Sequence, residues 1–178
     1  MAPGANSRRD APEVAFTLNR VFNAPRDLIW KCWTEKERLA EWWGPKGMAL
    51  KVVKLDLRPG GIFLYSMTTP TGQEMFGRFV YREIQAPERM SHVVSFCDAQ
   101  GQAIRHPGAP TWPIECLSIA TFTEKAGKTT IAMQFYPLNA SDEEIATFKA
   151  GHDGMKQGFG GTYDQLDVYL AKKAVAKA

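Results

Sequence analysis

The chain has 178 residues, of which 44% are apolar and 23% charged, and its formal net charge is +3. This length suits one ordinary globular domain. Lysine and arginine are scattered along the sequence, with the pairs Arg8-Arg9 and Lys172-Lys173 near its ends. A nucleic-acid-binding surface needs positive charge concentrated on one face, so we expect no nucleic-acid partner.

Signals for a membrane span, for secretion and for metal binding are absent from the sequence. No apolar stretch approaches the roughly 20 residues that cross a bilayer. Residues 1–13 lack the apolar segment of a secretory signal and are predicted to be a flexible tail. Cys32, Cys97 and Cys116 are widely separated and form neither a CxxC motif nor a Cys/His cluster. We therefore predict reduced, buried thiols in a cytoplasmic protein that holds no metal and no cofactor.

The first part of the chain predicts a strand followed by two short helices. Residues 14–22 alternate in the manner of a strand. Pro25 suits the first turn of a helix, and the apolar residues after it give that helix one buried side. A second helix is predicted over residues 35–42, with Thr34 as its N-cap and Glu37 as its partner in a capping box.

From Met48 onward the apolar residues recur with period two, which predicts a run of antiparallel strands. In the first of these strands, Val53, Leu55 and Leu57 are expected to share one face. The further strands are predicted at residues 62–67, 75–81, 90–97, 117–124 and 128–136. Residues 99–113 contain several prolines and glycines, and a loop of this length is typical of a lid or a binding loop.

The last part of the chain predicts a long amphipathic helix. Ser141 and Glu144 form a capping box at its start, and apolar side chains then recur every three or four residues as far as Leu170. A stripe of glycines lies beside the apolar stripe: Gly151, Gly154, Gly158 and Gly161. Such a stripe permits close approach of either the sheet or a ligand, and both interpretations stay open. We expect a bend or break near its first two glycines.

Aromatic and methionine side chains are concentrated on the faces that are predicted to point between the sheet and the last helix. The candidate ligand contacts among them are Phe63, Tyr65, Met67, Phe79, Tyr81, Phe96, Met133, Phe135, Met155, Phe159 and Tyr163. Bulky, adaptable side chains of this kind either fill a core or line a cavity, and composition alone favours a core.

Four short motifs follow one another in a specific order: Ala24-Pro25, Trp42-Trp43-Gly44-Pro45, Asp56-Arg58-Gly60-Gly61 and Pro87-Glu88-Arg89. Together with the segment GMKQGFGGTYDQLDVYL near the end, they make residues 14–173 resemble the AHSA-type family, the homologues of the activator of heat-shock protein 90 ATPase. That family belongs to the START-like, or SRPBCC, helix-grip superfamily.

The resemblance implies an α+β helix-grip fold, in which a seven-stranded curved antiparallel sheet is wrapped around a long C-terminal helix and two short helices follow strand 1. The domain is expected over residues 14–173, between an N-terminal tail of residues 1–13 and a C-terminal tail of residues 174–178. Relatives are similar in enclosing a cavity between sheet and helix. The resemblance therefore implies that this chain binds a hydrophobic or aromatic small molecule there.

Two other functions stay open at this point. The resemblance also implies that this chain could be an enzyme of the cyclase or lyase kind, because some helix-grip relatives place acid–base side chains inside the cavity; the candidates here are His152 and Tyr81. The sequence shows no set of nucleophile, base and orienting residue, which favours a binding protein over an enzyme. A co-chaperone-like module with a chaperone partner is suggested only by the family name.

Candidates for a rim or lid of the cavity are Trp43, Glu83 and Trp112.

Overall fold

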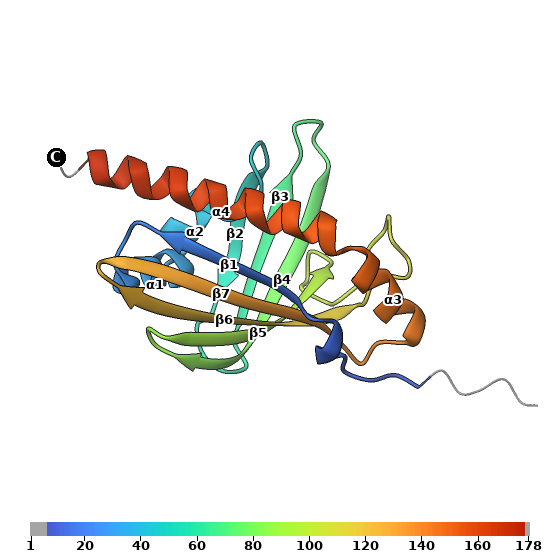
Figure 1. Cartoon of the computed structure of the whole chain (residues 1–178). Helices are drawn as coiled ribbons and strands as arrows, with labels where there is room; N and C mark the ends of the chain where they lie inside the picture. Colours follow the sequence, from blue (N-terminus) through green and yellow to red (C-terminus); the bar gives the residue numbers. More distant parts are fainter. Residues whose placement is uncertain (1–6, 177–178) are drawn as a thin grey trace, which may run out of the picture.

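A computed structural model describes residues 7–176 and shows seven antiparallel strands in one open, curved sheet (Figure 1). The strands are β1 (Phe16–Phe22), β2 (Ala49–Leu55), β3 (Ile62–Thr68), β4 (Glu74–Gln85), β5 (Arg89–Cys97), β6 (Glu115–Lys125) and β7 (Lys128–Leu138). The helices are the short 3-10 helix η1 (Pro12–Val14), α1 (Arg26–Thr34), α2 (Lys36–Trp42), α3 (Asp142–Ala150) and α4 (His152–Val175).

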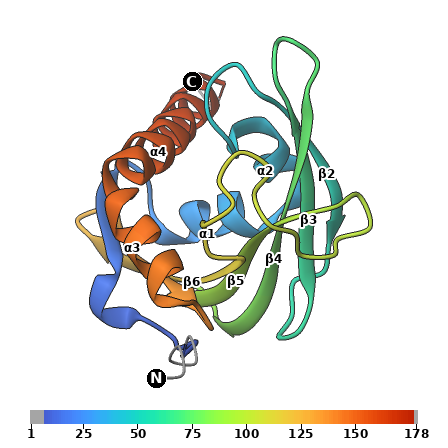
Figure 2. The same ribbon diagram turned by 90° about the vertical axis from the view of Figure 1, so that its right-hand side faces the viewer.

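The order of strands across the sheet is β1-β7-β6-β5-β4-β3-β2. Strands β2 to β7 follow one another as a meander, while β1 pairs with β7, so that β1 and β2 form opposite edges. The chain must therefore cross from one edge to the other after β1, and α1 and α2 make that crossing (Figure 2). The predicted helix-grip architecture, with two short helices after the first strand, is confirmed.

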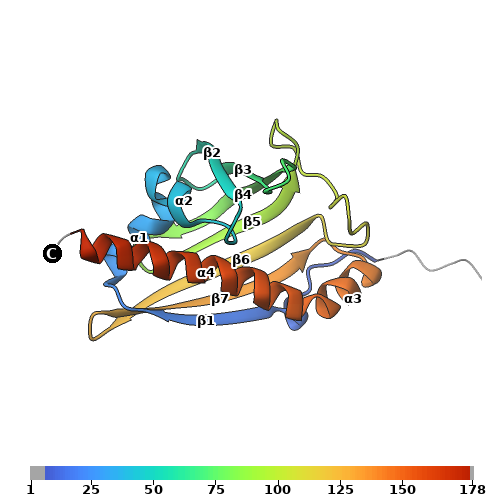
Figure 3. The ribbon, with the colours of Figure 1, turned by 90° about the horizontal axis from the view of Figure 1, so that it is seen from above.

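The long helix α4 runs across the concave side of the sheet (Figure 3). Its apolar side is buried, with Tyr163 and Leu166 almost inaccessible to solvent. At the sheet edge, Arg20 of β1 donates to Asp164 at 2.7 Å and also pairs with Asp167. Apolar packing along the helix and ion pairs at the edge therefore hold the same element in place.

The predicted break in the last helical segment lies at Gly151, which separates α3 from α4. The capping box at the start of α3 is confirmed, because the Ser141 hydroxyl accepts from the backbone of Glu144 and the Glu144 carboxylate accepts from the backbone of Ser141. The redirection at Gly151 lets α3 cover the end of the sheet while α4 follows its length.

The predicted side-chain alternation in β2 is wrong. The pairing register shifts between Val52 and Lys54, so Val52 is the buried residue and Val53 is 42% exposed. Leu57 lies beyond the end of the strand and is also exposed. A β-bulge of this kind adds one residue to a strand and reverses the faces of the residues on one side of it.

The predicted N-cap of α2 is also wrong. Glu35 occupies the N-cap position and makes no side-chain cap hydrogen bond. The hydroxyl of Thr34 instead donates to the carbonyl of Trp30 at 2.7 Å, within α1. Since α1 and α2 are separated by one residue only, Thr34 completes the first helix and cannot begin the second.

Part of the segment expected to be a flexible N-terminal tail packs on the domain. The backbone of Arg9 pairs in both directions with that of Ala140, and Ala11 is fully buried. Residues 1–6 of the expected tail lie outside the described residues. At the other end, α4 continues to Val175, beyond the boundary expected at residue 173.

We expect Leu166→Ala to lower the free energy of unfolding by about 2–5 kcal/mol, because it removes a fully buried side chain between α4 and the sheet. The matched control is Val168→Ala, two residues along the same helix but 47% exposed, which should change stability by less than about 0.5 kcal/mol. Urea unfolding followed by circular dichroism measures both. Equal losses in the two variants would contradict the described packing of α4.

Candidate ligand-binding pocket

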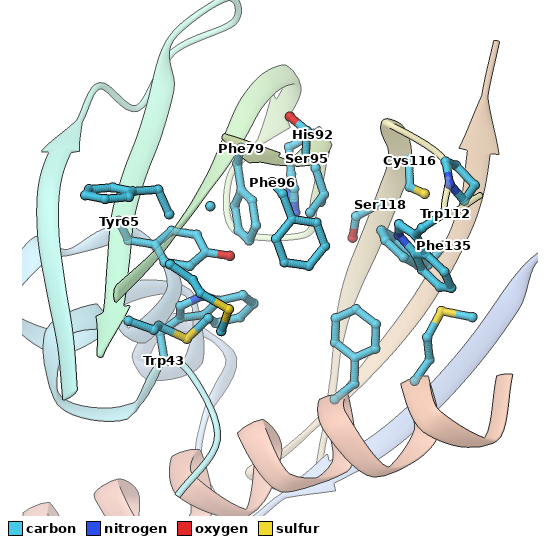
Figure 4. Close-up of a pocket in the computed structure, with 18 of the residues that line it drawn as sticks. Trp43, Tyr65, Phe79, His92, Ser95, Phe96, Trp112, Cys116, Ser118 and Phe135 are labelled. Carbon is cyan, nitrogen blue, oxygen red and sulfur yellow. The ribbon is translucent and has the colours of Figure 1, made fainter. Parts of the chain in front are cut away.

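An apolar pocket of about 240 Å³ lies between the concave face of the sheet and the first half of α4 (Figure 4). Strands β3 to β7 supply most of its wall, and Met155 and Phe159 of α4 close it from the opposite side. Trp43, which follows α2, and Trp112, from the loop after β5, lie on opposite sides of the pocket in Figure 4.

Eight of the eleven side chains predicted to contact a ligand line this pocket. These are Tyr65, Met67, Phe79, Phe96, Met133, Phe135, Met155 and Phe159. They come from five different elements, β3, β4, β5, β7 and α4, which the curvature of the sheet brings together. The eleven aromatic and methionine residues predicted to contact a ligand are therefore divided between a pocket and a core.

Phe63, Tyr81 and Tyr163 are the predicted contacts that do not line the pocket. All three are buried in the main apolar cluster, together with the aromatic residues of α1 and α2. Tyr163, for example, packs edge-on against Phe22 and Trp33 at ring distances of 5.5 and 6.3 Å. Side chains of α1 and α2 fill this end of the space, so the expected ligand contact at these three positions is replaced by core packing.

Several lining residues were not predicted from the sequence. They are Trp33, Met75, Phe76, Gly77, His92, Val94, Ser95, Pro113, Ile114, Cys116 and Ser118. Strand alternation provides a signal for some of them, because His92 and Val94 share parity with Phe96 in β5. Ser118 lies directly opposite His92 in the pairing of β5 with β6, and small polar residues of this kind are not noticed in a search for bulky apolar ones.

Two of the three predicted rim or lid residues, Trp43 and Trp112, line the pocket, and Glu83 does not. The carboxylate of Glu83 accepts from Arg89 at 3.1 Å. The register of β4 shifts between Tyr81 and Glu83, so Glu83 does not continue the inward-facing series of Phe79 and Tyr81.

The loop that carries Trp112 is tied to α3 by polar contacts. The guanidinium of Arg105 donates to the Glu144 carboxylate at 2.7 Å, and the hydroxyl of Thr147 donates to that of Thr111 at 2.9 Å. The loop therefore has a fixed position over this side of the pocket.

The glycine stripe of the last helix has a narrower role than either predicted interpretation. Only at Gly151 would an added Cβ meet another element, 2.8 Å from the ring of Trp112. At Gly154, Gly158 and Gly161 the same atom would find open space. Among the described residues, the only close approach to this stripe is therefore that of the Trp112 ring to Gly151, at the break between α3 and α4. At the other three glycines neither the sheet nor a residue of the pocket comes close to the helix backbone.

The two acid–base candidates do not reach the pocket. His152 donates from Nε2 to the carbonyl of Val14 at 3.1 Å and packs against Phe16 and Phe148. Tyr81 is buried in the core, where burial raises the pKa of its hydroxyl. Neither group is placed to transfer a proton to a molecule in the pocket.

His92 is the most unusual polar residue in the wall. Its ring is only 1% exposed and stacks on Phe79 with the ring centroids 4.0 Å apart. Burial lowers the pKa of its imidazole to about 3, and burial raises the pKa of the nearby Tyr65 hydroxyl to about 12. Both side chains are therefore neutral near pH 7, and none of the residues that line the pocket is charged.

The described residues contain no cluster of three or more His, Cys, Asp or Glu side chains suited to a metal. Within the same residues, no helix is sufficiently long and apolar to cross a membrane.

A curved antiparallel sheet that grips a long C-terminal helix, with an apolar pocket between them, defines a helix-grip domain. The chain belongs to the family of activator of Hsp90 ATPase homolog 1-like proteins, whose sequence model matches residues 23–171. No curated protein matches the chain by sequence.

Solved structures with this fold include three bacterial proteins. Protein Ms6760 from Mycobacterium smegmatis is 24% identical, with a TM-score of 0.74 and coverage of 96% of this chain and 99% of that one. A protein from Arthrobacter aurescens is 21% identical, with a TM-score of 0.76 and coverage of 92% and 90%. Protein NE0264 from Nitrosomonas europaea is 21% identical, with a TM-score of 0.71 and coverage of 92% and 97%. At these identities, the likeness establishes the fold alone.

Gly77 of β4 allows the ring of Tyr65 to lie across its strand, because an added Cβ would be 2.5 Å from that ring. We expect Gly77→Ala to displace Tyr65 and to lower stability by about 1–3 kcal/mol. Gly158→Ala, where the added carbon meets nothing, should instead stabilise α4 by up to about 1 kcal/mol. Thermal melts compare the two, and a destabilised Gly158→Ala would contradict the open space described there.

The lowered pKa of His92 predicts an acid-dependent loss of stability. Between about pH 6.5 and pH 3, the unfolded chain protonates this imidazole and the folded chain does not, so folding becomes less favourable as the pH falls. From about pH 7.5 to pH 5, the wild type should lose about 2 kcal/mol more than His92→Phe. Urea unfolding at both pH values tests this, and the same loss in both proteins would count against a neutral, buried His92.

Proposed function

We propose that this protein binds an uncharged hydrophobic or aromatic small molecule in the pocket between the sheet and α4, and that it acts in the cytoplasm. The observation that carries the proposal is a partly open apolar pocket of about 240 Å³ whose wall contains no charged side chain. Apolar pockets with a few polar groups are typical of small-molecule sites. The three buried free cysteines agree with a reducing compartment.

The size of the pocket supports this proposal on energetic grounds. Unfilled apolar space in a sealed core costs roughly 24 cal/mol per Å³, so a pocket of this size empty of both ligand and water would cost at most on the order of 6 kcal/mol. That amount is comparable with the whole stability of many domains. A fold that keeps such a space among large, adaptable side chains is best explained by a ligand that occupies it.

The binding function is favoured over the enzymatic one because His152 and Tyr81 lie away from the pocket. A role as a co-chaperone is suggested only by the description of the family. We therefore infer a carrier or sensor of a small molecule as the activity of this domain.

A ligand screen tests the proposal directly. Purified protein should show a bound species in native mass spectrometry, or a rise in melting temperature with members of a panel of uncharged aromatic and aliphatic compounds, since a ligand that binds only the native state stabilises it. If no compound is retained and no shift exceeds about 1 °C, the proposal fails.

Ser118→Phe should abolish these shifts while leaving the far-ultraviolet spectrum unchanged, because the added ring occupies the pocket from β6. We expect affinity for any ligand of the panel to fall by at least about tenfold, a loss of roughly 1.4 kcal/mol. The control is Thr123→Phe, which adds the same ring at an exposed position of the same strand and should bind as the wild type does. Equal binding by both variants would place the ligand elsewhere.

A further inference from the structure

His92 is a buried polar side chain without a hydrogen-bond partner in an otherwise apolar wall. Its Nδ1 atom has no partner among the described residues, although its ring is 1% exposed. Native proteins pair nearly all of their buried polar groups, because an unpaired one has lost its hydration without compensation. The Nδ1 atom itself is covered, but the ring lines the pocket and neither nitrogen bonds to another described residue, so the imidazole is free to pair with a polar group of a bound molecule.

Trp33 of α1 also has a buried polar atom without a hydrogen-bond partner among the residues that the structure describes. This atom is the indole nitrogen, and the side chain lines the same pocket. The indole nitrogen is covered by its neighbours, so His92 is the group from which the pairing is argued, and Trp33 contributes to the apolar wall. A ligand with one polar group and an apolar body matches this wall.

The charge state of the wall limits what that polar group can be. Burial keeps the imidazole of His92 neutral, so its two nitrogens are one donor and one acceptor. Because no charged side chain lines the pocket, a carboxylate or an ammonium group would be buried without a counter-charge. A hydroxyl group both donates and accepts, so it matches whichever nitrogen of the ring faces the ligand.

The size and lining of the pocket define the apolar body. An apolar cavity of roughly 150 Å³ accommodates benzene, so by proportion about 240 Å³ suits roughly ten heavy atoms, or two fused rings. Aromatic rings and methionine sulfur surround this space, and both make favourable contacts with a flat aromatic molecule.

We propose that the ligand is an uncharged hydroxyarene of about two fused rings, whose hydroxyl group hydrogen-bonds to the imidazole of His92. This inference rests on the proposed binding function and specifies its ligand class. His92 is the anchor that fixes the orientation of the ligand, and the stacked Phe79 holds the imidazole in place.

The test compares 2-naphthol, naphthalene and 2-naphthoate by calorimetry, with protein titrated into each probe. The wild type should bind 2-naphthol about tenfold more tightly than naphthalene, the usual effect of one added hydrogen bond, and should bind 2-naphthoate more weakly than either. In His92→Phe, which keeps a ring against Phe79, the preference for the hydroxyl should disappear while the affinity for naphthalene persists. His106→Gln is the control, because His106 does not line the pocket.

The outcomes separate the two proposals. If the wild type binds none of the probes or the broader panel, the binding function itself fails. If naphthalene and 2-naphthol bind the wild type equally, or if the preference survives in His92→Phe, the binding function stands and His92 is not the anchor. Tighter binding of 2-naphthoate than of 2-naphthol would likewise overturn the choice of an uncharged ligand.

A measurement on the wild type keeps the inference testable if His92→Phe does not fold. The chain has three histidines, so ¹⁵N-labelled histidine gives a simple spectrum. Addition of 2-naphthol should shift the ring nitrogens of His92 and leave those of His106 and His152 unchanged. A bound complex in which the His92 nitrogens do not move would overturn the proposal.

Discussion

The packing of tryptophans from α1 and α2 under the sheet decides which part of the concave space is core and which is pocket. Trp30 and Trp33 both meet the ring of Phe122 edge-on, at 5.3 and 5.6 Å, and Trp42 packs on Trp33 at 5.5 Å. Trp42 also donates from its indole nitrogen to the carbonyl of Cys32, which fixes the angle between the two helices. Because these side chains fill one end completely, the unfilled volume is confined to the other.

The end of the concave space that holds the pocket is covered by α3 and by the loop after β5, and both of them bond to the carboxylate of Glu144. Glu144 accepts the backbone N–H of Ser141 in the capping box of α3 and also accepts from Arg105 of the loop over the pocket. Burial by itself raises the pKa of Glu144, but these hydrogen bonds and the charges of Arg105 and Arg8 lower it overall. The helix start and the covering loop are thereby stabilised by the same ionised group, so the position of the loop depends on the fold of α3.

The fold was predictable from the sequence because the period-two strand patterns, the helical spacing of three or four residues, the capping residues and the turn residues agree with one another over most of the chain. The wrong predictions concern two local details: the bulge after Val52, which reverses the faces of β2, and the hydroxyl of Thr34, which bonds within α1 and does not cap α2.

The pocket was predictable only in part. Strand alternation shows which face of the sheet a residue occupies, but it does not show where side chains of other elements fill the space above that face. Phe79 and Tyr81 therefore appear equivalent in the sequence, although only Phe79 lines the pocket. His92 is a small part of a long apolar strand, and its unpaired state is visible only in three dimensions.

The arrangement of tryptophans has a practical consequence. Of the five in the chain, Trp33, Trp43 and Trp112 line the pocket, and they approach it from α1, from the segment after α2 and from the loop after β5. Any occupant therefore changes the surroundings of most of the indoles at once, from more than one direction. The protein consequently carries an intrinsic optical reporter, and its ultraviolet emission should register occupancy without an attached dye.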